Sequence, residues 1–461
     1  MTDLERRTLF EDSPVHIAVL HQILPAIAAQ MVTLLYNLAD TYFVGLLNNP
    51  SHTAAVTVSY SPFMLLTVVS NLFGIGGASS ISRALGRKES KMPANISSVS
   101  FWFGSLSAFL YGIVFVFIRN PVLRLCGATD EIFELCEGYA LWVILLGGIP
   151  TVMNQLLANL IRSDGNARTA AFGTSLGGII NILLDPIFVL PRFLGLGAIG
   201  AGIATAVSNL ISAGFLLLFL VLKSKSTVLS LNPRLIPKGL SRIHEIFSSG
   251  IPSAIQIGLT VVAVTAMAKF VSFYGTKPVA AFGIVKKIDQ LPLFFSIGVA
   301  NGMMPLLAYN YASGNSKRRR SIFRFGTGIS VSFSITCLII YELFAPSLTG
   351  FFIKESETVS YASRFLRIMV IAMPLMAYCY PMIIQFQAMK KSKEAVICSI
   401  LRKGTLDIPL LFLMNKFSPL YGCMFVQPIV DFISLIVSSI FYQRILNEEK
   451  QTLEKHSLSV N

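Results

Sequence analysis

Long apolar stretches fill the chain from residue 15 to residue 446, with short polar stretches between them. A helix needs about 20 mainly apolar residues to cross a bilayer, and each stretch reaches that length. Several stretches hold about 30 residues, so we expect tilted or kinked helices. The pattern predicts twelve membrane-spanning helices, over residues 15–46, 53–82, 94–118, 131–161, 167–190, 197–222, 243–273, 278–312, 322–344, 358–389, 394–415 and 420–446.

The composition agrees with a lipid environment. Of the 461 residues 54% are hydrophobic and 13% are charged, whereas a soluble domain carries about 25% charged residues. No long polar stretch precedes the tail after Arg444, so we expect no domain outside the membrane. The chain is therefore predicted to be an all-α, multi-pass protein of the cytoplasmic (inner) membrane. Prolines inside the predicted helices fit a packed bundle; they are Pro25, Pro62, Pro150, Pro252, Pro292, Pro305 and Pro374.

The Lys and Arg residues are distributed unevenly between the predicted loops. The net charge is +14, and most of the 37 Lys and Arg residues lie in alternate loops and in the two tails. Cytoplasmic loops carry such an excess, so we expect both termini in the cytoplasm and loops 47–52 and 345–357 outside. The basic run at 317–320 then contacts lipid headgroups. Membrane lipids are expected partners, and nucleic acid is not.

The two halves of the chain resemble each other. Matching positions recur about 226 residues apart, a period that indicates an internal repeat. Six helices in each half give two lobes of equal orientation, and substrate sites of such proteins lie between the lobes near the membrane midplane. We expect an N-terminal lobe over 1–225 and a C-terminal lobe over 226–461. The matches are Pro25 with Pro252, Gly86 with Gly314, Pro150 with Pro374, and Asn166 with Ser392.

Polar residues form a stripe on the first predicted helix. Gln30, Thr33, Asn37, Asp40 and Thr41 fall on one side at helical spacing. An isolated Asp at the centre of a membrane helix costs about 2.5–3.5 kcal/mol to insert, so this side must face protein or water.

The fifth predicted helix repeats this pattern. Thr174, Gly178, Asn181 and Asp185 share one side, and Pro186 cannot donate to the carbonyl four residues before it. These groups serve either to join helices or to bind a coupling ion. The positions of the second half that correspond to Asp40 and Asp185 hold apolar residues. Ion coupling can use such a difference between the halves, whereas helix packing does not require one.

Several segments resemble the multidrug and toxic compound extrusion (MATE) transporters, in particular the MepA-like and DinF-like branches. The segments are Pro25 with Leu35-Tyr36-Asn37-Leu38-Ala39-Asp40-Thr41-Tyr42-Phe43-Val44-Gly45, Arg162-Ser163-Asp164-Gly165-Asn166, Asn181-Ile182-Leu183-Leu184-Asp185-Pro186, and Gln427-Pro428-Ile429-Val430-Asp431. The likeness runs from about residue 15 to about residue 445. It implies two six-helix bundles that open alternately to the two sides of the membrane.

The resemblance also implies a set of ion-coupling residues, namely Asp40, Asn154, Asn181, Asp185 and Thr205. The chain departs from the family in two places. Gln256 stands where the sodium-driven branch often has an acid, and Lys390 replaces a usual glycine. The first departure favours protons, while carboxylate, amide and hydroxyl oxygens leave sodium possible. No cofactor other than H⁺ or Na⁺ and no bound metal is expected.

Further polar residues are candidates for a substrate cavity. In the second half, Lys286 and Lys287 either line a cavity, reach an interface, or pair with Asp289. Asp431 belongs to a family segment, whereas Asp407 fits no pattern. The predicted cavity residues are Gln30, Tyr36, Asn37, Gln256, Lys286 and Asp289.

Three classes of function fit these features. The first is a cation-coupled efflux antiporter for drugs or metabolites, working as a monomer on organic cations or amphipathic compounds. The second is a flippase for lipid-linked intermediates, which the two adjacent lysines keep open. The third is a channel or scaffold, which the repeat and the one-sided acids disfavour. No nucleophile and base pair or phosphate loop is present, and an enzyme is not expected.

Overall fold

The computed structural model describes residues 3–47 and 49–458, and every regular element among them is a helix. A short amphipathic start precedes the first long helix, and a connector joins the two halves. The first half holds α1 (Asp3–Arg7), η1 (Thr8–Asp12), α2 (Val15–Gly45), α3 (Pro50–Gly86), α4 (Met92–Leu125), α5 (Phe133–Ala140), η2 (Leu141–Leu146), α6 (Gly148–Ser163), α7 (Ala167–Val189) and α8 (Gly197–Leu222).

The second half begins after a connector of short helical turns, η3 (Pro233–Leu235), α9 (Ile236–Gly239) and η4 (Leu240–Arg242). The predicted boundary between residues 225 and 226 lies just before this connector and stays a prediction. The remaining helices are α10 (Ile243–Ser272), α11 (Thr276–Ala312), α12 (Ser316–Phe352), α13 (Ser356–Val370), α14 (Ala372–Ala388), α15 (Ser392–Ile400), η5 (Leu401–Thr405), α16 (Asp407–Phe417) and α17 (Tyr421–Leu458).

Each of the twelve predicted segments coincides with a helix or with a broken helix. Nine continuous helices among the described residues are long and apolar enough to cross a membrane, and two bent pairs add two more spans. The pairs are α5–η2 with α6, bent by 49°, and α13 with α14, bent by 44°. The one remaining predicted segment, 394–415, is the eleventh along the chain and corresponds to α15, η5 and α16, with charged residues at its break. The prediction of an all-helical membrane protein is confirmed.

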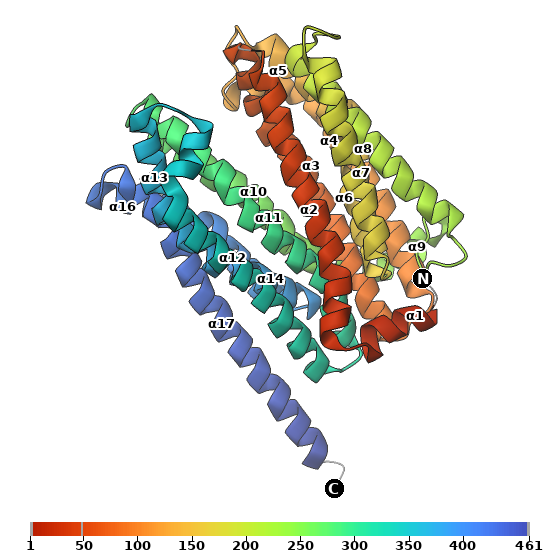
Figure 1. The fold of residues 1–461 in the computed structure, drawn as a ribbon. Helices are drawn as coiled ribbons and strands as arrows, with labels where there is room; N and C mark the ends of the chain where they lie inside the picture. The colour runs from red at the N-terminus through yellow and green to blue at the C-terminus, as the bar shows by residue number, and fades with distance from the viewer. Residues whose placement is uncertain (1–2, 48, 459–461) are drawn as a thin grey trace.

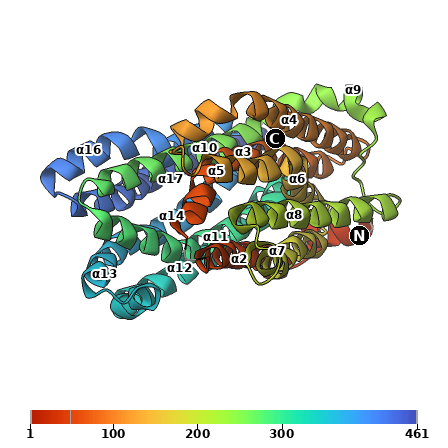
Figure 2. The same ribbon diagram turned by 90° about the horizontal axis from the view of Figure 1, so that it is seen from above.

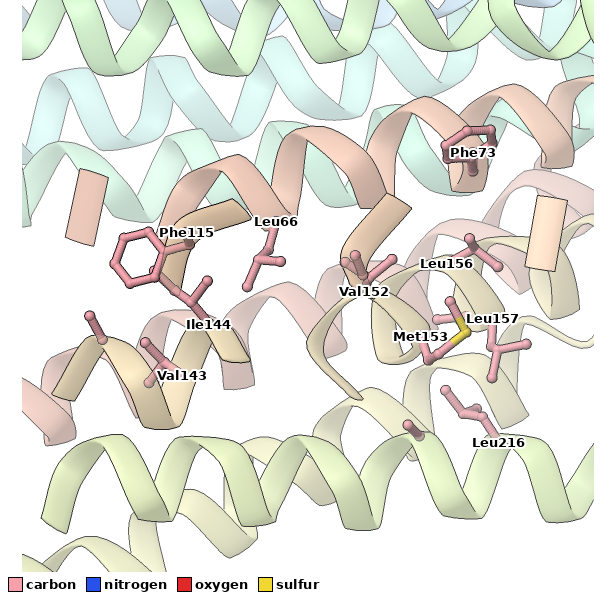
Figure 3. Packing of buried hydrophobic residues seen from close by; sticks show 14 of the residues in the cluster. Leu66, Phe73, Phe115, Val143, Ile144, Val152, Met153, Leu156, Leu157 and Leu216 are labelled. Atoms are coloured by element: carbon pink, nitrogen blue, oxygen red, sulfur yellow. The ribbon is translucent and has the colours of Figure 1, made fainter. Parts of the chain in front are cut away.

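The first half has its own apolar core between α3, α4, α6 and α8. Figure 3 shows Leu66 and Phe73 of α3 facing the same interior as Ile144 and Leu156, and all four side chains are buried. Large aliphatic and aromatic side chains fill the space between these helices. This core holds the first lobe together, and Ile246 of α10 packs against it from the second half.

The two halves meet along a seam of glycines. Gly76 lies against the carbonyl of Ile246, where an added Cβ would come within 2.3 Å, and Gly250 lies equally close to Leu72 of α3. Gly302 of α11 packs on α2 in the same way. Because a missing side chain lets two helix backbones touch, these glycines fix where the lobes join. We call Gly76, Gly250, Gly298 and Gly302 the glycine seam.

The seam lies toward the side of the molecule that carries α1 and the end of α17, which we call the terminal side. Figure 2 shows α10 beside α3 and α11 beside α2 in the middle of the molecule, and close contacts are found for both pairs. A buried cluster spans both halves there and includes Ile23, Ala78 and Met303. Toward the opposite, distal side the two bundles diverge (Figure 1).

The N-terminal segment connects both lobes across the terminal side. Arg6 pairs with Asp164 of the first lobe at 2.7 Å, and both side chains are buried. A few residues later Tyr309 of α11 donates to Glu11 at 2.6 Å, and the Phe10 ring lies 5.0 Å from the Tyr309 ring. We call α1 and η1 together the N-terminal strap, because it is tied to both lobes.

Candidate functional site

The two predicted acids of the first lobe face each other from α2 and α7. Gly178 allows this approach, since an added Cβ would come within 2.7 Å of Val32 on α2. Asp185 is fully buried. Asp40 lies close enough to Asp185 for the two carboxyl groups to interact electrostatically. The polar stripes predicted on the two helices therefore meet inside the lobe.

The predicted amides and hydroxyl surround Asp185. The Asn181 amide donates to Asp185 Oδ1 and to Thr205 Oγ1, both at 3.5 Å. Asn154 lies farther along the same network and donates to Asn209 Oδ1 at 2.9 Å. All five predicted coupling residues thus lie in one region of the first lobe; their role in ion coupling stays a prediction.

Three oxygen atoms of this region have no hydrogen-bond partner among the residues that the structure describes. They are Asp40 Oδ1, Asp185 Oδ2 and Asn181 Oδ1, and all three are buried. Buried polar atoms are normally bonded, so three acceptors without a donor need an explanation. A proton on a carboxyl group would supply a donor, and a hard cation would bind the same oxygens. A proton or a cation at this place would therefore satisfy the unpaired oxygens.

Other residues of this network were not predicted from the sequence. Ser212 donates to Asn154 Oδ1 at 2.7 Å, and Asn209 donates to the Thr205 carbonyl at 3.0 Å. These two residues follow Thr205 at helical spacing on α8, and that stripe could have identified them. Tyr139, which interacts electrostatically with both acids, gave no such signal because it lies before the break in its helix.

The predicted cavity residues of α2 lie beyond the glycine seam. Gln30 and Asn37 follow Ile23 at intervals of two helical turns, and Ile23 is the residue on which Gly302 packs. Both side chains are partly exposed. They therefore lie on the side of α2 that faces the second lobe. Tyr36 lies against Gly178 instead and interacts electrostatically with Asp40.

The predicted residues of the second lobe lie on two helices, α10 and α11. Lys286 pairs with Asp289 at 3.1 Å, with side chains 24% and 18% exposed, so pairing is the alternative that the structure shows. Lys287 lies on the same side of α11 as Gly298, three turns away, and therefore faces the first lobe. Gln256 of α10 is buried, and its Nε2 atom has no hydrogen-bond partner.

Asp407 lies directly after a break in the eleventh predicted span. Lys403 and Gly404 leave the helical conformation, with φ of −142° and 139°. The Gly404 backbone N–H donates to Asp407 Oδ2 at 2.8 Å. The carboxylate thus lies in the first turn of α16, where negative charge is favoured, and binds the backbone just before that helix. The sequence pattern did not predict this contact because it depends on the positive φ of Gly404.

Asp431 is the acceptor of a buried network at the same break. Arg402 donates to its Oδ1 at 3.0 Å, and Gln427 donates to its Oδ2 at 2.9 Å. Arg402 and Asp431 are both 1% exposed, and the guanidinium lies 4.2 Å from the centre of the Tyr380 ring. Lys403 donates to Gln427 Oε1. We call Arg402, Lys403, Gln427 and Asp431 the break network.

Lys390, the second departure from the family, has a backbone consequence. It adopts φ of 58°, a left-handed conformation that suits the glycine usual there. Its ammonium lies 3.7 Å from Glu245 of α10. The residue thus adds a cation beside the place where the two lobes join.

Comparisons with known proteins agree with this arrangement. The chain is 28% identical to the multidrug export protein MepA of Staphylococcus aureus over 418 residues, 91% of each chain. It is 26% identical to MepA of Staphylococcus haemolyticus, over 98% of both chains.

Solved structures share the fold. An outward-facing multidrug resistance MATE family transporter superposes with a TM-score of 0.90 at 22% identity, over 98% of this chain and 99% of that one. A MOP superfamily transporter from Pyrococcus furiosus gives 0.87 at 22% identity, with the same coverage. The sequence model of the MatE family matches residues 25–187 and 252–413. With that match over most of its length, the chain belongs to the MATE family of membrane transporters.

Proposed function

We propose that this protein is a cation-coupled antiporter that exports small amphipathic or cationic molecules by alternating access. The observation that carries the proposal is the trio of buried, unpaired oxygens on Asp40, Asn181 and Asp185. A cation-coupled transporter needs a site that takes up and releases a positive charge, and the unpaired oxygens support such a role for this region. The relatives named as multidrug export proteins support export, and they give no support to the flippase alternative.

The terminal side is the cytoplasmic side in this proposal. The ends of α3 and α11 on this side are followed by basic loops, as the positive-inside rule requires. The lobes then join on the cytoplasmic side and diverge on the outer side, which corresponds to an outward-open form. In that form the acids of the first lobe, near the distal ends of α2 and α7, receive the ion from outside.

Protonation couples the ion to the substrate in the following way. Removal from water disfavours the charged form of a carboxyl group, and a second carboxylate nearby acts in the same direction. A proton on Asp40 or Asp185 gives the site the donor that it lacks, toward Asn181 Oδ1. When the proton is on Asp40 of α2, the new hydrogen bond to Asn181 of α7 draws the two helices together and narrows the cavity, so that the substrate leaves. For a substrate without net charge, one charge moving inward across 100 mV supplies about 2.3 kcal/mol, which drives about fiftyfold accumulation.

Efflux from proteoliposomes with separately imposed proton and sodium gradients tests the proposal. Asp40→Asn and Asp185→Asn keep the size of the side chain and remove the titratable group, so each should abolish gradient-driven efflux of an organic cation. Asp130→Asn is the control, since that carboxylate is exposed and pairs with Arg124 on the surface. Substrate affinity should fall as the pH falls, and this dependence should be lost in Asp40→Asn.

Two results would decide against proton coupling. Wild-type efflux in both acid variants would show that these carboxyl groups carry no coupling ion. Substrate affinity that stays constant from pH 5 to 9 while sodium shifts it would assign the site to sodium, which the same oxygens can bind.

A further inference from the structure

A groove lies between α11 and α12 of the second lobe. Its volume is about 530 Å³, within the range of about 300–1,000 Å³ that is usual for sites of small organic molecules. Phe295 of α11 forms one wall, and α12 forms the other with residues from nearly three of its turns. The residues of α12 are Arg324, Phe325, Gly328, Ile329, Ser332 and Phe333. We call this feature the α11–α12 groove.

The groove opens toward the bilayer. Arg324, Gly328 and Ser332 follow one another at intervals of four residues, so they lie along one side of α12, and all three are exposed. Ile335 and Ile339 continue this side and are 44% and 51% exposed. Large aliphatic side chains that are exposed on a membrane-spanning helix face lipid chains. Lipid is therefore the neighbour of the groove.

The walls of the groove are held in place by the protein itself. Ser330 of α12 donates to Ser296 Oγ of α11 at 3.1 Å. The rings of Phe295 and Phe333 stack across the two helices with their centres 3.8 Å apart. An added Cβ at Gly328 would meet no atom within 4 Å, so the missing side chain leaves the groove open. The two helices therefore form the groove without a bound molecule.

Arg324 brings a positive charge to one end of this apolar groove. Its neighbour Arg320 pairs with Glu449 at 2.8 Å, whereas Arg324 forms no ion pair within the described part of the chain. Arg324 lies on the terminal side, two residues inside the predicted span 322–344, and Phe333 lies about 14 Å farther along the helix. A cation at the membrane surface and an apolar groove below it match the headgroup and the chain of an anionic lipid.

We propose that the α11–α12 groove binds one anionic phospholipid of the cytoplasmic leaflet, with the phosphate on Arg324 and one acyl chain along Gly328 and Phe333. A guanidinium binds phosphate through two parallel hydrogen bonds. Basic pockets between membrane helices on the cytoplasmic side bind anionic headgroups. The choice of leaflet rests on the cytoplasmic position of the terminal side in the proposed function, whereas the contacts do not depend on the coupling ion.

Quenching of a single tryptophan by brominated lipids tests the site. Trp102 and Trp142 of the first lobe are replaced by Phe, and Ile335→Trp places the reporter one turn beyond Ser332 in the full-length protein. Nanodiscs of phosphatidylcholine contain increasing fractions of either phosphatidylglycerol or phosphatidylcholine with brominated chains. Half-maximal quenching should need about fivefold less of the brominated phosphatidylglycerol, since one basic residue contributes about 1 kcal/mol to the binding of anionic lipid.

Variants of the groove separate the headgroup contact from the chain contact. Arg324→Gln should make the two brominated lipids equally effective, and Arg324→Lys should keep most of the preference. Gly328→Leu keeps the cation but fills the open space, so it should also make the two lipids equally effective. Lys317→Gln is the matched control, because it removes the same charge from an exposed position of the same helix outside the groove. This control should keep the fivefold preference.

Three results would overturn the site. Equal quenching by the two lipids with the native groove means that chains enter without regard to the headgroup. Equal loss of the preference in Lys317→Gln and Arg324→Gln means that the membrane surface as a whole attracts the lipid. No quenching by either lipid, together with a dimer on size-exclusion chromatography, assigns the groove to a second copy of the chain. Gradient-driven efflux is measured separately, so failure of the lipid site is distinguishable from failure of the export mechanism.

Discussion

Arg83 of α3 is a buried charged residue that joins the two lobes on the terminal side. It is 1% exposed, and it donates to Ser249 Oγ and to the Gln387 carbonyl, both at 3.2 Å, and to the Glu245 carbonyl at 3.4 Å. All three acceptors belong to the second lobe. We predict that Arg83→Met shifts the protein toward a form that is open on the terminal side.

The size of the shift follows from these contacts. A hydrogen bond from a charged donor contributes about 1.5–3 kcal/mol. The three hydrogen bonds are long, so each is taken at the low end of this range. The guanidinium regains hydration when the lobes separate, which offsets part of their sum, and the net contribution to the closed form is about 3 kcal/mol. Each 1.4 kcal/mol is a factor of ten, so the variant should favour the opened form roughly a hundredfold more than the wild type does. Glu245 keeps Arg242 at 2.8 Å, so no buried carboxylate is left unpaired.

Spin labels at Ser90 and Lys393 report the separation of the lobes. Both residues are exposed on the terminal side, one in each half. Cys126, the least buried native cysteine, is first replaced by Ser. Double electron–electron resonance on Arg83→Met in nanodiscs should show a new population at longer distance that is minor in the unsubstituted protein.

Arg87→Met is the matched control. Its side chain is 30% exposed and lies 3.6 Å from Glu245, and an ion pair of this kind contributes about 0–1 kcal/mol. The control should therefore keep the wild-type distances. Identical distance distributions in Arg83→Met and the wild type would refute the reasoning that this arginine holds the lobes together.

Two further predictions concern topology and the helix break. In intact cells, Lys317→Cys should react with a thiol reagent only if the reagent crosses the membrane, whereas Phe417→Cys should react with an impermeant one; the reverse pattern would invert the topology. Gly404→Ala should lower the melting temperature by several degrees, since φ of 139° strains any other residue and an added Cβ lies 2.8 Å from Leu259. Gly283→Ala, with open space around it, should leave the melting temperature equal or raise it, and a Gly404→Ala protein as stable as this control would contradict the strain argument.

The positions of the helices were predictable because the bilayer sets their length. The predicted segment 197–222 coincides with α8, and most other ends differ from the structure by a few residues. The breaks were not predictable. The segment 394–415 looks like one span, and its interruption at Lys403 and Gly404 is stabilised by Asp431 from a different helix. Because this stabilising contact comes from a distant part of the chain, no local sequence pattern predicts the break.

The candidate coupling residues could be predicted to the extent that they repeat at helical spacing. Asp40 and Asp185 belong to polar stripes on two otherwise apolar helices, and the structure places the two carboxyl groups near enough to interact electrostatically. The position of Tyr139 depends on how α5 packs across the lobe, which a single helix does not encode. In the same way, Lys286 and Lys287 are adjacent in sequence, yet only the fold shows that one is paired and the other faces the first lobe.

The glycine seam lies near one end of the helices that it joins, so those helices act as levers. From Gly298 to its distal end α11 runs about 22 residues, or about 33 Å at 1.5 Å per residue. A rotation of about 10° around the seam moves that end by about 6 Å, while the backbones in contact at the seam move by less than 1 Å. Movements at the seam that are small enough to preserve its close packing are therefore multiplied severalfold at the far end of the lobe.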